Sequence, residues 1–178
     1  MSVIQTERTV LRWVEWTDLN LIHELHSLPE TDRYNALGIP EDIGVTECIV
    51  KSWIEEHNLD SVQNYTFTIE SRLDKSFIGL FGLKLGNKKY KRGEVWFKLH
   101  STHWNKGYGT ECLKAVLRYG FDTLNLHRIE AGCAVENIGS VKVLEKAGMI
   151  KEGRGRQVLP LKSGWSDNFE YAILDTDR

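Results

Sequence analysis

The spacing of apolar side chains changes along the chain and divides it into predicted elements. Residues 8–14 (RTVLRWV) have the pattern of a short strand. Apolar positions then recur at helical spacing, at Leu21, Ile22, Leu25 and Leu28. We predict a helix that begins at a Thr17 cap and stops at Pro29, because proline cannot continue a helical hydrogen-bond ladder.

A second helix is predicted after a turn-rich stretch over residues 35–44. Thr46 is its expected cap, and one face carries Ile49, Val50, Trp53 and Ile54. Both helices have one apolar and one polar face, which is typical of helices that cover a sheet.

From residue 65 the apolar period becomes two, which predicts strands. Residues 65–70, 76–86 and 90–100 alternate apolar and polar side chains between polar turns, the signature of an antiparallel meander. In the last of these, Val95, Phe97 and Leu99 take one face of the strand, and Glu94, Trp96 and Lys98 take the other.

The second half of the chain alternates helices and strands. Residues 107–122 and 137–148 have helical period, and residues 127–135, 150–158 and 165–174 have strand character. We predict one α/β domain over residues 1–178, with a mixed sheet and helices on its faces.

Composition excludes several classes of protein. The 178 residues include 41% hydrophobic and 27% charged side chains, which fits neither a disordered chain nor a coiled coil. The 23 Lys and Arg residues are balanced by 25 Asp and Glu residues, so nucleic acid is not an expected partner.

Cysteine usage and hydropathy indicate a cytoplasmic protein without a membrane span. Cys48, Cys112 and Cys133 are odd in number and widely spaced, so we interpret them as reduced and structural. No apolar run approaches the roughly 20 residues that span a bilayer. The histidine pairs at i, i+3 spacing lack a third ligand, and no metal site is predicted.

The strongest candidate for chemistry is the segment from Asn105 to Thr110, which runs through two glycines directly into a helix. Glycines allow a ligand to approach the backbone, and the N–H groups of a first helical turn attract an anion. Lys106 adds a positive charge. An ordinary turn before a helix is an equally good interpretation of these glycines alone.

Several separated motifs make the chain resemble the GNAT superfamily of acyl-CoA-dependent N-acyltransferases. They are TERTVLRW, SFIGLFGLKLG, GEVWFKLH and the long run HWNKGYGTECLKAVLRYGFDTLNLHRIEAGCAVENIGSVKVLEKAGMIKEGRGR. The family's acetyl-CoA loop reads Gln/Arg-x-x-Gly-x-Gly/Ala. Trp104 stands at its first place, as in the branch of Rim-type ribosomal-protein N-terminal acetyltransferases, with Gly107 and Gly109 at the others.

The resemblance implies a mostly antiparallel sheet whose fourth and fifth strands splay apart to admit the pantetheine arm of acetyl-CoA. Acetyl transfer to an amine is then direct. The residues implied in acetyl-CoA binding are Leu99, Trp104, Asn105, Lys106, Gly107, Tyr108, Gly109, Thr110 and Asn137. A homodimer is common in the branch and is a further expectation.

The resemblance also implies two catalytic residues. Many members carry a tyrosine acid where this chain has Leu144, whereas the Rim-type branch uses a serine at the position of Ser140. A serine near a helix start also often hydrogen-bonds only to backbone. Glu94 is the candidate base, since the family often places an acid there. A solvated strand carboxylate is the alternative.

The predicted function is acetyl-CoA-dependent N-acetylation, most simply of a protein or peptide N-terminal α-amine. One alternative acceptor is a small-molecule amine such as a polyamine or an aminoglycoside-like compound. A non-catalytic acyl-CoA-binding module is a further alternative, because the usual tyrosine is absent.

Overall fold

One eight-stranded sheet organises the computed structural model, which describes residues 3–178. Its strands are ordered β1-β2-β3-β4-β5-β6-β8-β7, and every neighbouring pair is antiparallel except β5 and β6. The strands are β1 (Ile4–Gln5), β2 (Thr9–Trp13), β3 (Asn64–Ser71), β4 (Phe77–Leu85), β5 (Arg92–Leu99), β6 (Arg128–Ala134), β7 (Ile150–Leu161) and β8 (Gly164–Leu174).

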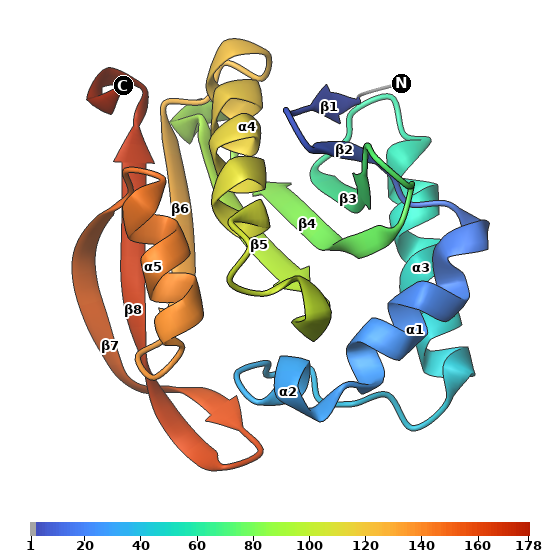
Figure 1. The fold of residues 1–178 in the computed structure, drawn as a ribbon. Helices are drawn as coiled ribbons and strands as arrows, with labels where there is room; N and C mark the ends of the chain where they lie inside the picture. Colours follow the sequence, from blue (N-terminus) through green and yellow to red (C-terminus); the bar gives the residue numbers. More distant parts are fainter. Residues whose placement is uncertain (1–2) are drawn as a thin grey trace.

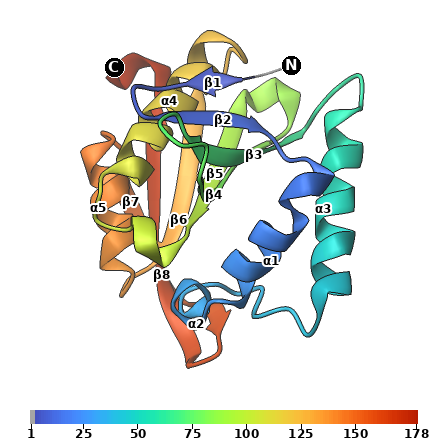
Figure 2. The same ribbon diagram turned by 45° about the vertical axis from the view of Figure 1, so that its right-hand side comes forward.

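Helices cover both faces of this sheet, as the sequence predicts. They are α1 (Leu19–Ser27), α2 (Pro29–Asp32), α3 (Ile43–His57), α4 (Tyr108–Asp122) and α5 (Ile138–Lys146). Figure 2 shows α4 and α5 on one side of the strands and α1 and α3 on the other. This arrangement gives the mixed α/β fold with two separate apolar cores.

The two cores follow from the alternation of side chains along the strands. Phe67, Phe81 and Ile129 point toward α4 and α5 and are fully buried there. Leu80 points the other way and packs with Ile22, Leu25 and Val50 of α1 and α3. The apolar stripe predicted on residues 107–122 is buried in the first core.

The feature that opens the sheet is the short pairing between β5 and β6. Their parallel ladder holds only three residue pairs, which end at Glu94 and Glu130. Beyond Glu94, β5 continues to Leu99 and turns away from β6 (Figure 1). With β1 counted as the first strand, this opening lies between the fifth and sixth strands, which are the fourth and fifth of the sequence prediction.

Two predicted helix caps are wrong. A 3₁₀ turn over Trp16–Asp18 precedes α1, so Thr17 lies inside this turn. The cap of α3 is Asp42, whose carboxylate accepts from the Val45 N–H at 3.2 Å. Thr46 is fully buried, and its hydroxyl lies 2.8 Å from His23 Nδ1. Local preference favours a threonine at a helix start, but the contact of Thr46 with His23 overrides that preference.

Pro29 ends α1, as predicted, and also starts the four-residue α2, where a proline in the first turn loses no hydrogen bond. Strand β1 was not predicted, because two residues are too short to show a period.

Burial of His26 makes the stability of the fold depend on pH. Burial and the nearby positive charges of Lys98 and His23 lower the pKa of His26 to about 4. The unfolded chain therefore takes up a proton below about pH 6.5 that the folded chain does not. Stability from this group is present above pH 6.5 and is lost as the pH falls toward 4.

We predict that this residue alone lowers the free energy of unfolding by about 2 kcal/mol between pH 7 and pH 5. Urea unfolding of the parent and of His26→Asn at both values measures it. The decrease should be smaller in the variant by that amount, and parallel pH dependences in the two proteins would contradict the prediction.

Candidate functional site

The loop before α4 is shaped by two residues with left-handed backbone. Asn105 has φ 59° and Gly107 has φ 84°, a region that glycine and asparagine adopt at low cost. Gly107 is the N-cap of α4, and no side chain caps the helix. The N–H groups of the first turn therefore lack intrahelical partners and form a seat for an anion.

The two glycines of this segment were both expected to let a ligand approach the backbone, and for Gly109 the structure shows a different reason. A Cβ built on Gly109 points into the protein, 3.2 Å from Val143 of α5 and 3.5 Å from Leu99. Gly109 lets α4 pack closely against α5 and the end of β5, whereas Gly107 is the glycine that the turn requires.

The end of β5 is tied to this loop. The indole N–H of Trp104 donates to the Leu99 carbonyl oxygen at 2.8 Å, while the ring remains 41% exposed. The structure thus brings together Leu99 and the predicted loop residues, which are Trp104, Asn105, Lys106, Gly107, Tyr108, Gly109 and Thr110. Lys106 is exposed, so its ammonium group is available to an anion.

The start of α5 holds Asn137 and Ser140 together. Asn137 is the N-cap, and its Oδ1 accepts from the Ser140 N–H at 3.1 Å. Ser140 is half-buried, and its Oγ makes no hydrogen bond within residues 3–178. The hydroxyl is thus free to donate. Leu144 is 1% exposed and packs in the core with residues of α4, so its side chain contributes to packing.

The opposite face of β5 carries Glu94, Trp96 and Lys98, as the alternation predicts. Trp96 lies 6.0 Å from Trp53 of α3, ring to ring. Both indoles line a cavity of about 290 Å³ between α3 and the sheet, together with Glu56, Thr66 and Lys84 among others. Glu94 is exposed, does not line this cavity, and its carboxylate has no partner among the described residues.

A buried polar cluster at the end of β5 was missed by the sequence analysis. Lys98 Nζ, Asp32 Oδ1 and Asn35 Nδ2 are buried and have no hydrogen-bond partner in the described part of the chain. The Asn35 N–H donates to the Asp32 carbonyl oxygen at 2.8 Å, and Asn35 Oδ1 accepts from the Leu37 N–H at 3.2 Å. The side-chain amide nitrogen of Asn35 is therefore left without a hydrogen-bond partner among the described residues.

Electrostatics connect Lys98 and Asp32. Burial lowers the pKa of Lys98 to about 8, and the nearby charge of Asp32 offsets part of that effect. The Lys98 ammonium and the Asp32 carboxylate do not form an ion pair within 4.0 Å. The alternation of β5, combined with the two helices predicted to cover the sheet, was the available signal that the ammonium group of Lys98 is buried.

Other candidates are structural. Cys112 is fully buried, and burial raises the pKa of its thiol to about 11, which disfavours a nucleophile. No group of three or more His, Cys, Asp or Glu side chains within residues 3–178 is arranged to hold a metal. None of the helices in this range is long and apolar enough to cross a membrane.

Comparison with known proteins gives consistent matches over nearly the whole chain. The family described as "Acetyltransferase (GNAT) domain" matches residues 8–150. The uncharacterized N-acetyltransferase YnaD of Bacillus subtilis is 34% identical over 176 residues, which cover 98% of each chain.

Two solved structures have the same fold. A GNAT-family acetyltransferase from Bacillus anthracis has a TM-score of 0.85 at 28% identity, covering 98% of this chain and 99% of that one. A spermidine N-acetyltransferase from Vibrio cholerae, in complex with CoA and spermine, has a TM-score of 0.84 at 27% identity, covering 95% and 96%.

Proposed function

Because the chain belongs to the GNAT family of acetyl-CoA-dependent N-acetyltransferases, we propose that its acceptor is the α-amine at the N-terminus of a peptide or protein. Acetyl-CoA supplies an activated acetyl thioester to this reaction. The protein must hold the coenzyme, present a neutral amine, and protonate the departing sulfur.

The residues at the opening of the sheet fit the coenzyme. We assign its pyrophosphate to the backbone N–H groups of residues 105–110, which no side chain caps, with Lys106 adding charge. The pantetheine arm is assigned to Leu99 on the free edge of β5 and to the amide nitrogen of Asn137, which has no hydrogen-bond partner in the part of the chain that the structure describes. Asn137 caps α5 and its side chain accepts from the Ser140 N–H, so the assigned acid lies beside this arm.

The observation that carries the acceptor proposal is the buried cluster of Asp32, Asn35 and Lys98. Its unpartnered atoms are two donors and one acceptor, which complement the C=O and N–H of a peptide group. A peptide N-terminus carries such a group next to its amine. A protonated polyamine offers only donors, so it would leave the Lys98 ammonium unpaired and repel it.

Proton equilibria favour the same acceptor. An α-amine with a pKa near 7.7–8.0 is about a tenth unprotonated at pH 7, whereas a lysine amine near 10.4 is about 0.04% unprotonated. Presenting a lysine as the nucleophile would therefore require about 3.5 kcal/mol more from the site. Glu94 is exposed and is the one carboxylate of β5, on the same face as Lys98. A single exposed carboxylate suits the deprotonation of an α-amine better than that of a lysine amine.

A small-molecule amine is the second candidate acceptor. Its support is the similarity in fold and sequence to the spermidine N-acetyltransferase of Vibrio cholerae. The two candidates differ at Lys98, where a peptide would place a carbonyl acceptor and a polyamine would place only donors. The experiment below uses this difference.

We predict that the protein acetylates short peptides with a free N-terminus and no lysine faster than spermidine, and faster than N-blocked peptides carrying one lysine. Competition among the three at pH 7, followed by mass spectrometry, measures the preference. Faster acetylation of spermidine would move the assignment to the small-molecule candidate.

Replacing Lys98 by Met tests the carrying observation. Loss of a hydrogen bond from a charged donor should raise KM for the peptide by about tenfold or more, and leave KM for acetyl-CoA unchanged. Lys89→Met, at an exposed lysine in the turn before β5, is the matched control. An unchanged peptide KM in Lys98→Met would remove the cluster from acceptor binding.

Ser140→Ala should lower kcat by about 100-fold with little change in CoA affinity, since donation to sulfur strengthens as the C–S bond breaks. Steady-state kinetics at saturating substrates and calorimetry with CoA measure the two effects. Ser140 is not the acid if kcat stays within about twofold of the parent.

Glu94→Gln should lower the rate and flatten its rise with pH, provided the carboxylate accepts or relays the proton of the amine. The measurement is a pH–rate profile of kcat/KM for the peptide. A profile that superimposes on the parent's would assign the proton to another acceptor.

A further inference from the structure

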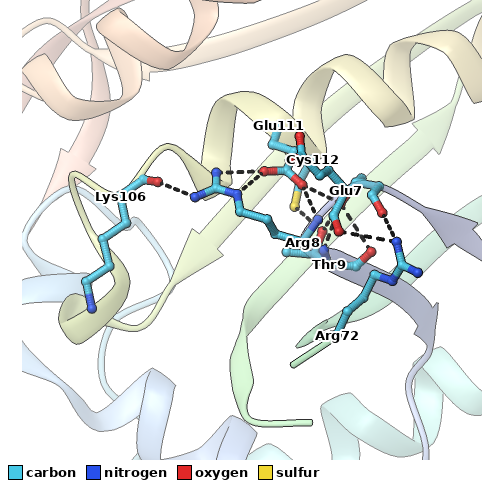
Figure 3. Close-up of polar contacts among 8 residues, drawn as sticks. Glu7, Arg8, Thr9, Arg72, Lys106, Glu111 and Cys112 are labelled. Carbon is cyan, nitrogen blue, oxygen red and sulfur yellow. Dashed lines mark hydrogen bonds and ion pairs between the residues drawn. The ribbon is translucent and has the colours of Figure 1, made fainter. Parts of the chain in front are cut away.

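A polar network joins the N-terminal turn to the start of α4, about 100 residues away in sequence. Arg8, just before β2, forms an ion pair with Glu111 in the first turn of α4 (Figure 3). Its Nε donates to Glu111 Oε2 at 2.6 Å, and its backbone N–H donates to Oε1 at 2.8 Å. Thr6 Oγ1 donates to the same Oε1 at 2.6 Å. The Glu111 carboxylate thus binds both Thr6 and Arg8 of the turn before β2.

The same guanidinium contacts the loop assigned to the coenzyme. Its Nη1 donates to the Lys106 carbonyl oxygen at 3.0 Å, and its carbon lies 4.6 Å from the centre of the Tyr108 ring. A Cβ built on Gly107 would lie 3.3 Å from Nη2. Arg8 therefore borders the three residues that lead into α4.

Supporting contacts fix this arrangement. The guanidinium of Arg72 donates to the carbonyl oxygens of Thr6 and Glu7, at 2.9 and 3.2 Å. Glu111 is largely buried, with 18% of its side chain exposed. Burial opposes its ionisation, but the hydrogen bonds from Thr6 and Arg8 outweigh this and lower the pKa of Glu111. The carboxylate is charged and the pair is intact at neutral pH.

We propose that Arg8 is a positioning residue for coenzyme A, which fixes the Lys106–Tyr108 backbone through its contacts with Glu111, the Lys106 carbonyl and the Tyr108 ring. The inference rests on the assignment of the pyrophosphate to this loop. Its physical basis is that Lys106 and Gly107 lie between Asn105 and α4 without any side-chain cap. A donor that holds the Lys106 carbonyl oxygen fixes the orientation of the peptide groups that follow, and so of the N–H groups assigned to the pyrophosphate.

Glu111 holds the Arg8 guanidinium in place in this proposal, so removal of either partner must weaken coenzyme binding. Direct attraction between Arg8 and a phosphate predicts otherwise. Neutralising Glu111 would then leave the charge of Arg8 uncompensated and strengthen binding of the anion. The sign of the effect of Glu111→Gln separates the two roles.

The experiment is calorimetric titration of the full chain with CoA, accompanied by kcat at saturating acetyl-CoA. We expect Arg8→Ala and Glu111→Gln each to raise the Kd of CoA by about tenfold, while kcat stays within about twofold. Arg8→Lys keeps the charge but loses the planar fork, so it should not restore affinity.

The chain offers a closely matched control in the Arg154–Asp167 pair of the β7–β8 hairpin. There, Arg154 Nε donates to Asp167 Oδ2 at 2.7 Å, and the Gln157 N–H donates to Oδ1 at 2.8 Å. Side-chain exposures are 58% and 19%, against 43% and 18% for Arg8 and Glu111. Arg154→Ala removes an equivalent ion pair away from the loop and should leave the Kd of CoA unchanged.

Gly107→Val, which strains the loop directly, reports whether CoA uses it at all. If Gly107→Val weakens CoA binding but Arg8→Ala does not, the positioning role is wrong and the loop assignment stands. If neither variant changes the Kd, both are wrong. Tighter binding by Glu111→Gln, or full affinity in Arg8→Lys, would also overturn the positioning role in favour of simple charge attraction.

Discussion

The site depends on the separation of β5 from β6 after three paired residues. A sheet that stayed paired along this edge would bury the backbone of β5 beyond Glu94 and leave no path between its two faces. Once the strands part, the edge of β5 presents backbone donors and acceptors that a ligand can pair with. The same opening lies next to both α4 and α5, so the loop, Leu99 and Ser140 gather around one point of the sheet.

Two kinds of polar group meet this opening from opposite faces. On the α4 side, positive charge is provided by an uncapped helix start and by the exposed Lys106. On the α1 and α3 side, Lys98 Nζ and Asp32 Oδ1 are buried and have no hydrogen-bond partner among residues 3–178, an arrangement that costs free energy unless a bound group completes it. The positive charge on the first face is complementary to a diphosphate, and the unpartnered donor and acceptor on the second face are complementary to an uncharged amide.

Much of the fold follows from local pattern. The periods of two and 3.6 residues predicted the strands from β2 to β8 and the helices α1, α3, α4 and α5, because those elements bury regular faces. Helix starts were less predictable. Asp42 and Thr46 are both good caps by preference, and the choice between them depends on the bond between Thr46 and His23, which no local pattern contains.

The candidate site divides in the same way. Trp104 and Gly107 lie in the predicted loop before α4, and Asn137 lies at the predicted start of α5, because short motifs mark these places in the sequence. Their roles in binding stay predictions. Arg8 and Lys98 lie in two of the quoted motifs, TERTVLRW and GEVWFKLH. The letters of a motif do not show their interactions, which reach 103 and 98 residues along the chain for Arg8 and to Asp32 of α2 for Lys98. A loop with left-handed residues and no cap is costly to hold in one conformation. Part of that cost must be offset by contacts outside the loop, so its motif alone cannot define a binding site.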